Sequence, residues 1–164
     1  MKKLIGDWAY TLSDKYKVSY NLVRNVITAY LQYNVEKVCR GERVVLIGLG
    51  TILPYQEETH YFSTPAYDCK LISEKYGITQ ATVWGIIQGY FASARKDLVE
   101  GTNVTFKGLC TFSVSKDVNT NEIFNVYVNI SRTLVDKLAS IGCTARVKLN
   151  PKLRREIKSE KVII

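Results

Sequence analysis

An internal repeat constrains the fold of this chain more than any other feature of its sequence. Residues 12–52 align without a gap to residues 72–112, at a constant offset of 60. Eleven of the 41 aligned pairs are identical, and most of the others keep their apolar or polar character. A repeat of this kind predicts one supersecondary unit that is used twice.

Each repeat predicts a pair of helices. A first helix is expected to end near Tyr16 or Tyr76, and Ser19 or Thr79 is placed to cap a second helix. Apolar residues then recur at steps of three and four, which is the stripe of a helix that faces a core. These residues are Leu22, Val23, Val26, Ile27, Tyr30 and Leu31 in the first repeat, and Val83, Ile86, Ile87, Tyr90 and Phe91 in the second.

Strands are expected to follow the helix pair. Gly41 and Gly101 suit the left-handed position that closes a helix. Short strands are then predicted over residues 44–47 and 104–107, each running into a Gly-Leu-x-Thr turn and a second strand. The unit is therefore helix, helix, turn, strand, turn, strand.

The run "VVLIGLGTI" also resembles the start of a dinucleotide-binding site. Such a site needs Gly-x-Gly-x-x-Gly, a helix directly afterwards and an acidic residue about 20 positions further on. A second strand follows here instead, and Gly50 is replaced by Cys110 in the second repeat. We expect Gly48, matched by Gly108, to make the tight turn, Gly50 to be replaceable, and no phosphate to bind.

The second repeat is followed by a hairpin and a helix. Residues 113–130 predict a strand, a polar turn around residues 119–121 and a return strand. In that strand Phe124, Val126 and Val128 share one face. Ser131 is expected to cap a short helix, which Gly142 ends.

No closing helix follows the first repeat. The chain passes instead through Pro54 and Pro65 into the next helix, and Pro65 suits the start of that helix. We therefore predict an α+β chain with a first unit over 1–64, a second over 65–142 and a basic C-terminal extension over 143–164.

The helix pair, the glycine and the strand–Gly-Leu–strand corner resemble the HU/IHF family of bacterial DNA-architectural proteins. The likeness covers roughly residues 2–53 and 66–140. It implies two tandem HU/IHF-like units, each a helix pair with an antiparallel β-hairpin sheet, that together form a single-chain pseudo-dimer. Members of the family are dimers whose long β-ribbon arms enter the DNA minor groove, where a proline wedges between base pairs.

The regions that correspond to those arms differ from the family. No Lys or Arg occurs between Arg43 and Lys70, and Glu57 and Glu58 lie within that stretch. The second unit has a short hairpin with one lysine, two acidic residues and no proline. Carboxylates oppose the cation–phosphate contacts that supply much of the affinity for duplex DNA. We therefore expect the chain to share the family's fold without its way of binding DNA.

The net charge of +8 is concentrated near the end of the sequence. Seven basic residues lie between Arg146 and Lys161, against two acids. The sequence leaves two alternatives for this tail: a disordered basic arm for nucleic acid, or a strand and helix that add to a neighbouring subunit. Its final residues, Val162, Ile163 and Ile164, favour burial against a partner. If the tail instead binds nucleic acid, the residues expected to contact it are Lys152, Arg154, Arg155 and Lys158.

Aromatic residues crowd the linker between the repeats. Tyr55, Tyr61, Phe62 and Tyr67 lie there, and tyrosine is enriched at protein interfaces because it combines apolar area with a polar end. Two alternatives are open: a docking segment, or packing over the junction of the units.

The sequence predicts no catalytic, metal or cofactor site. The four cysteines lie far apart with no Cys-x-x-Cys pair, which predicts reduced, mostly buried thiols. His60 is the only histidine and lies in the polar linker, where a surface position or an assembly contact is the simplest interpretation. We also expect no small-molecule substrate. No membrane span is expected because no window approaches roughly 18 uninterrupted apolar residues, and no secretory segment is expected because Asp7 comes too early for its apolar region.

These features favour a non-enzymatic structural protein. Lost arms, a tyrosine-rich linker and an apolar-ended tail resemble the HU/IHF-like ring proteins of crAss-like bacteriophages. That resemblance implies a homo-oligomeric ring in the virion tail or neck, in contact with other virion proteins and made in the bacterial host cytoplasm. The alternative is an architectural protein that binds or bends duplex DNA in the cytoplasm or nucleoid.

Overall fold

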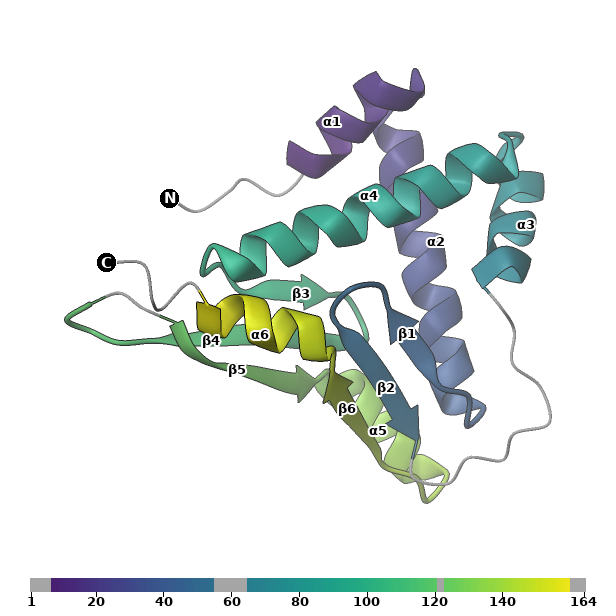
Figure 1. The fold of residues 1–164 in the computed structure, drawn as a ribbon. Helices are drawn as coiled ribbons and strands as arrows, with labels where there is room; N and C mark the ends of the chain where they lie inside the picture. The colour runs from purple at the N-terminus through teal and green to yellow at the C-terminus, as the bar shows by residue number, and fades with distance from the viewer. Residues whose placement is uncertain (1–6, 55–64, 121–122, 160–164) are drawn as a thin grey trace.

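The chain alternates helix pairs with short antiparallel strands, in an α+β arrangement (Figure 1). A computed structural model describes residues 7–54, 65–120 and 123–159. The described residues form six helices and six strands. In chain order these are α1 (Asp7–Tyr16), α2 (Tyr20–Cys39), β1 (Val44–Leu46), β2 (Gly50–Pro54), α3 (Pro65–Tyr76), α4 (Gln80–Val99), β3 (Val104–Phe106), β4 (Cys110–Lys116), β5 (Ile123–Ile130), α5 (Arg132–Ser140), β6 (Ala145–Leu149) and α6 (Pro151–Ser159).

The strands form two antiparallel three-stranded sheets. The first sheet has the order β1-β2-β6 and the second the order β3-β4-β5. In the first sheet, β2 pairs with β6 from Gly50↔Leu149 to Pro54↔Ala145. In the second sheet, β4 pairs with β5 from Cys110↔Ile130 onward. The first sheet is therefore completed by a strand that comes from the far end of the described chain.

The expectation that the first unit lacks a closing helix is wrong, because β6 joins the first sheet and α6 follows it and packs on α4. The backbone N–H of Asn150, just after β6, donates to the carbonyl of Leu49 at 2.9 Å, and that of Ser131, just after β5, donates to Leu109 at 2.8 Å. β6 and α6 thus do for the first unit what β5 and α5 do for the second. Residues 145–159 therefore contain a strand and a helix rather than a disordered arm, and the strand pairs with β2 of the same chain. The predicted limits of the units, 1–64 and 65–142, stay a prediction.

A second and shorter repeat signals this arrangement in the sequence. Leu153 and Ile157 of α6 are buried, as are Leu134 and Leu138 of α5, and the two pairs have the same spacing. Residues 145–149 alternate apolar and basic, which is the period of a half-exposed strand. Asn-Pro then predicts a helix start, since asparagine is a good cap and proline is favoured at the first helical position.

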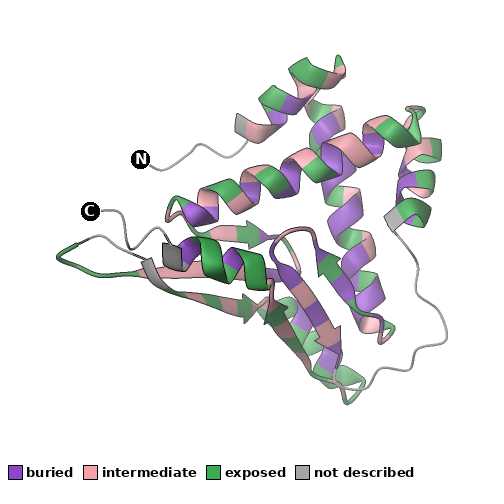
Figure 2. Cartoon of the chain, viewed as in Figure 1, coloured by how far each residue is buried: buried purple, intermediate pink, exposed green. Residues whose placement is uncertain are grey.

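Two long helices hold the units together. α2 and α4 cross at the centre of the molecule and are buried along much of their length (Figures 1 and 2). α1 packs on both α2 and α4, and so does α3. α5 packs on α2, whereas α6 packs on α4. Each unit's second helix therefore contacts the first and closing helices of the other unit.

The two cores differ in chemistry at equivalent positions. In the second unit Phe91, Phe106 and Phe112 are fully buried; the Phe91 and Phe106 rings stack with centroids 5.3 Å apart. The first unit has Leu31, Leu46 and Ile52 at the positions 60 residues earlier, all buried. Tyr30 of α2 meets Phe91 of α4 edge-to-face at 6.1 Å, so the aromatic cluster reaches across both units.

The predicted helix caps are confirmed at the two long helices. Ser19 Oγ accepts from the N–H of Leu22 at 3.1 Å, and Thr79 Oγ1 accepts from that of Thr82 at 3.2 Å. Gly41 and Gly101 follow these helices with φ of 82° and 95°.

Ser131 occupies the predicted N-cap position of α5, but its side chain makes no cap hydrogen bond. α5 still begins at Arg132, one residue beyond the N–H that is tied to Leu109. At the equivalent point before α6, the longer side chain of Asn150 accepts from the N–H of Lys152 at 2.8 Å.

The glycine turns of each unit pack on the other unit's helix. Gly48 has φ of 76°, and a Cβ there would lie 3.1 Å from Arg95 Cδ on α4. Gly108 has φ of 81°, and its Cβ would lie 3.2 Å from Val35 Cγ2 on α2. Val35 and Arg95 are themselves 60 residues apart, so the two contacts are equivalent.

Gly50 is not replaceable, contrary to the expectation drawn from Cys110. A Cβ at Gly50 would lie 2.6 Å from the backbone oxygen of Lys148 on β6, much closer than two such atoms approach. β6 therefore lies against β2 at a point where any side chain would collide. The second unit accepts Cys110 at this position, opposite Ile130.

The hairpin of the second unit is turned by Asp117. Its Oδ1 accepts from the N–H groups of Asn119 at 2.8 Å and Thr120 at 3.2 Å, which confirms the predicted polar turn within the described residues. Val126 and Val128 share a face as predicted, pairing with Val114 and Phe112, whereas the Phe124 side chain lies outside the described residues. None of the helices in the described part of the chain has the length and apolar character to cross a membrane.

Replacing Leu153 by Ala tests whether α6 belongs to the core. Leu153 is 1% exposed, so Leu153→Ala should lower the free energy of unfolding by about 2–5 kcal/mol through lost burial and a cavity. Lys152→Ala, an exposed neighbour on the same helix, should change it by less than about 0.5 kcal/mol. Urea denaturation followed by circular dichroism measures both; equal effects would mean that α6 is peripheral.

Gly50→Ala tests the close approach of β2 and β6. We expect a loss of about 1–3 kcal/mol in unfolding free energy, because the added methyl group must push two paired backbones apart. Thr51→Ala is the matched control, since Thr51 is the next residue of β2 and its side chain lies on the opposite face. If Gly50→Ala unfolds at the same urea concentration as Thr51→Ala, the strands are not in contact there.

Candidate functional site

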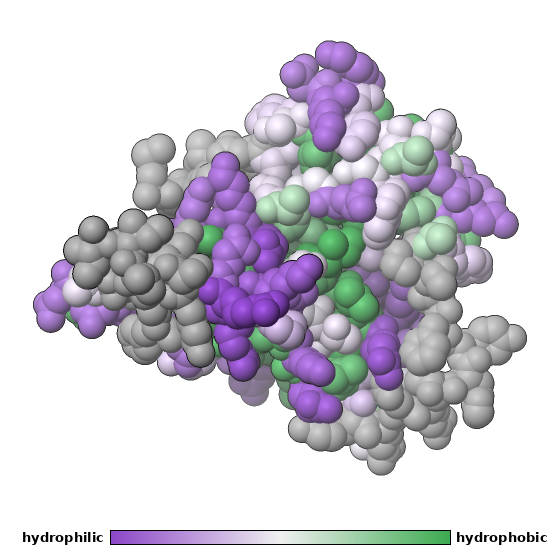
Figure 3. Space-filling model, viewed as in Figure 1, coloured by the Kyte–Doolittle hydropathy of each residue, from purple (hydrophilic) through white to green (hydrophobic). Residues whose placement is uncertain are grey.

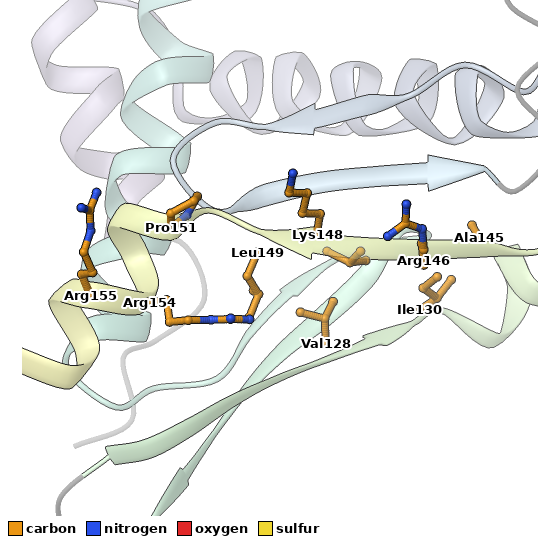
Figure 4. A pocket seen from close by; sticks show the side chains of 10 residues that line it. Val128, Ile130, Ala145, Arg146, Lys148, Leu149, Pro151, Arg154 and Arg155 are labelled. Atoms are coloured by element: carbon orange, nitrogen blue, oxygen red, sulfur yellow. The ribbon is translucent and has the colours of Figure 1, made fainter.

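A groove runs between β5 and β6, where the edges of the two sheets face each other (Figure 4). We call it the intersheet groove; its volume is about 840 Å³. β5 contributes one wall, and β6 with the first turns of α6 contributes the other. Its lining consists of Val128, Ile130, Ala145, Arg146, Val147, Lys148, Leu149, Pro151, Arg154 and Arg155.

The apolar lining comes from side chains that leave the core only half covered. Val147 pairs with Ile52, and Val128 pairs with Phe112; both inner partners are fully buried, whereas both edge residues are half-buried. Val128 and Ile130 point from β5 toward β6, and Leu149 points from β6 toward β5 (Figure 4). The apolar interior of the two sheets is therefore accessible along this groove.

Cations surround the apolar strip. Arg146 and Lys148 alternate with the apolar residues of β6 and are exposed. Arg154 and Arg155 are exposed on α6, and Arg154 lies alongside Leu149 (Figure 4). Hydrophilic side chains gather over α6, next to more hydrophobic surface at the centre of the same face (Figure 3). The groove thus combines apolar contact area with positive charge.

Arg95 fixes the wall that carries these cations. Its Nε donates to the carbonyl oxygen of Gly48 at 3.1 Å, and its guanidinium lies 2.7 Å from the Glu156 carboxylate of α6. One side chain of α4 therefore joins the turn of the first unit to the helix that closes it. The carboxylate that lies nearest to Arg155 in sequence is engaged in this contact.

The outer face of the second sheet is polar and carries little charge. Tyr127 of β5 is 47% exposed on this face and pairs with Ser113 of β4. Hydrogen bonds from Ser115 and Asn125 lower the pKa of Tyr127. The Thr105 and Thr111 hydroxyl groups lie 3.1 Å apart on the same sheet. A duplex-binding surface would be expected to carry cations, and they are sparse among the described residues of this sheet.

A buried ion pair joins α2 to α3. Lys37 Nζ binds the Asp68 carboxylate, and both side chains are about 5% exposed or less. Burial raises the pKa of Asp68, while the hydrogen bond and charge of Lys37 act in the opposite direction. The positions 60 residues away are Asp97 and Trp8, and Trp8 packs edge-to-face on Tyr90 at 4.6 Å. Equivalent positions in the two repeats therefore make different interactions: an ion pair between α2 and α3, and an aromatic contact between α1 and α4.

The structure brings together only some of the residues predicted from sequence. Arg154 and Arg155 line the intersheet groove, and Lys152 is exposed on the same helix outside it. Tyr67 is 53% exposed on α3, in a different part of the molecule. The other predicted contact residues are outside the described ranges, or have side chains outside them: Tyr55, Tyr61, Phe62, Lys158, Val162, Ile163 and Ile164.

Two groove residues were missed as site candidates. Arg146 and Lys148 count among the basic residues of the tail, but only the pairing of β6 with β2 places them beside the groove. The alternation "ARVKL" signals a half-exposed strand, so it could have predicted that these two side chains share a face.

Two of the four cysteines, Cys69 and Cys110, are buried. No disulfide joins the four cysteines, all of which lie in the described ranges. Burial raises the pKa of the Cys110 thiol to about 12 and that of Cys69 to about 11. His60 is outside the described residues, and within them no three His, Cys, Asp or Glu side chains cluster as metal ligands do.

No protein-family model matches the chain, and no curated protein sequence matches it.

Alkylation at pH 8 tests the burial of the thiols. A thiol with a pKa of about 12 is ionised in about one molecule in 10⁴ at that pH, and Cys110 is also 1% exposed. Iodoacetamide should therefore modify half-buried Cys143 well before Cys110 or Cys69 in the native protein, and all four at similar rates in urea. Peptide mass spectrometry gives the order; rapid native labelling of Cys110 would contradict the described core.

Proposed function

We propose that this chain is a non-enzymatic virion structural protein, an HU/IHF-like ring component of a bacteriophage tail or head-to-tail connector. In this proposal the two units form a single-chain version of the HU/IHF dimer, and the molecule assembles through protein–protein contacts with its own copies and other virion proteins. The bacteriophage setting and the ring come from the resemblance stated above. They imply a location in the tail or neck of the particle, after synthesis in the host cytoplasm.

Reciprocal contacts between the units support the pseudo-dimer. α1 packs on α4 and α3 packs on α2, so each first helix leans on the other unit's long helix. The Gly48 turn meets Arg95, and the Gly108 turn meets Val35. This exchange of equivalent contacts is what the intertwined helices of an HU-type dimer would produce if the two subunits were joined.

The strands of the second sheet lie in sequence between β2 and β6 of the first sheet. This insertion is the observation that favours assembly over DNA bending. In the family, the arm is a long two-stranded β-ribbon. Here the β2–β6 ladder stops at Pro54↔Ala145, and residues 55–144 connect these strands. The first unit therefore has no two-stranded ribbon in the described part of the chain. The second has a short hairpin that turns at Asp117.

Nucleic-acid binding is the second candidate function. The observation that favours it is the gathering of Arg146, Lys148, Arg154 and Arg155 around one groove. Cations that displace counterions from phosphates supply most of the affinity in non-specific binding. The residues predicted for this alternative from sequence, Lys152, Arg154, Arg155 and Lys158, all belong to α6.

Sedimentation and duplex binding separate the two functions. In the proposed function the purified chain forms large homo-oligomers in analytical ultracentrifugation, and a fluorescent 30-base-pair duplex shows no binding at about 150 mM salt. In the alternative, duplex affinity falls steeply with salt, and the slope decreases by about 1 for each phosphate-binding cation replaced.

Lys148→Ala/Arg154→Ala/Arg155→Ala is the variant that tests the alternative. Arg132→Ala/Lys137→Ala, at two exposed positions of α5, is the control. A monomer that binds duplex DNA, and loses that binding only in the first variant, would overturn the proposed function. Large oligomers that are indifferent to duplex DNA would overturn the alternative.

A further inference from the structure

The intersheet groove has the backbone of a strand acceptor. β5 pairs only with β4 and β6 only with β2 among the described strands, and no backbone hydrogen bond joins β5 to β6. Each strand therefore turns an edge toward the groove, and such edges are templates for an added strand. The half-buried Val128, Ile130 and Leu149 supply apolar contacts beside these edges.

Charge defines what kind of segment this groove would accept. Lys148, Arg154 and Arg155 are exposed beside it, and the Glu156 carboxylate on the same helix binds Arg95. A matching segment would carry carboxylates, lack lysine and arginine, and present large apolar side chains. These are requirements of complementarity, which governs partner selection and encounter more than total area does.

Residues 55–64, "YQEETHYFST", meet all three requirements. They carry Glu57 and Glu58, no lysine or arginine, and the aromatic residues Tyr55, Tyr61 and Phe62. Ten extended residues span about 33 Å, and the five residues of β6 span about 17 Å. We infer that this segment of one copy docks in the intersheet groove of a second copy.

The fold argues for a neighbouring copy as the source of the segment. Within one chain the segment must connect Pro54, opposite Ala145 at the start of β6, to Pro65 at the start of α3. α3 packs on α2 and α4, and lies on the opposite side of α2 from α6 (Figure 1). A segment lying in its own groove would have to double back along β6 and then return within ten residues.

Docking of this kind is heterologous, since the groove of one copy meets the segment of the next. Repeated head-to-tail contacts close into a ring or continue as a filament. The inference rests on the proposed assembly function and names the surfaces that would carry it.

Charge exchange on the full chain tests the inference. Arg154→Glu/Arg155→Glu places two carboxylates on the α6 side of the groove, and Glu57→Lys/Glu58→Lys makes the segment basic. Each variant alone then places like charges together and should sediment as a monomer at concentrations where the unaltered chain is oligomeric. An equimolar mixture restores every contact, because each groove meets a segment of opposite charge, and should recover the large species. Thermal unfolding by circular dichroism verifies that each variant is folded.

A peptide separates this inference from the proposed function. A fluorescent peptide of residues 54–65 should bind the intact chain and bind Arg154→Glu/Arg155→Glu at least about tenfold more weakly, with Arg132→Glu/Lys137→Glu as the matched control. If the unaltered chain is monomeric but the peptide still binds in this pattern, the assembly function fails and the groove–segment contact stands. Oligomers that are unaffected by either charge reversal overturn the inference and leave the function.

Two further outcomes also overturn the inference. If the charge-reversed variants stay at the unaltered chain's mass but melt at lower temperature, and stability returns when all four changes are combined in one chain, the segment docks on its own groove. If the groove variant loses affinity for duplex DNA with no change in oligomeric mass, the groove is a nucleic-acid site.

Discussion

The pairing of β2 with β6 is the interaction on which the rest of the structure depends. It closes the first sheet, places α6 on α4 and sets the edge of β6 opposite that of β5. The pairing is possible only because Gly50 leaves room for the Lys148 carbonyl. Arg95 then ties the closed end to the long helix of the other unit through Gly48 and Glu156. Without the β2–β6 ladder the first sheet would lack its third strand, and the intersheet groove would keep only the wall that β5 contributes.

Two copies of one unit in a single chain are free to diverge, because each half always meets the same partner. The buried Lys37–Asp68 pair occurs at one junction, and the Trp8–Tyr90 contact at the other. A buried ion pair contributes little net stability once the free energy of desolvation is counted. An arrangement that separates the two residues leaves a buried charge without its partner, and such an arrangement is therefore destabilised. The phenylalanine cluster and its aliphatic counterpart differ in the same way. Such differences give the two halves separate identities.

The sequence predicted the repeated elements well because their signals are local. Ser19 and Thr79 act as the predicted caps, and the apolar stripe that contains Tyr30 and Tyr90 is the buried face of each long helix. What it did not predict depends on contacts between distant residues. Cys110 made Gly50 look replaceable, although the collision at Gly50 comes from a strand almost a hundred residues away. The groove cations were likewise visible as a basic tail, but their gathering around an apolar strip required the strand order.

The insertion of one unit into the other fixes the order in which the molecule can be completed. During synthesis, α3 through α5 form a continuous stretch that holds all strands of the second sheet. β1 and β2 emerge earlier, but their third strand leaves the ribosome only after the whole inserted unit. The nascent first half therefore waits with an open sheet edge and an uncovered apolar face, a state that favours wrong pairing with other nascent chains. Its final folding step is a long-range closure, which is slow because the ends of a large loop must first meet.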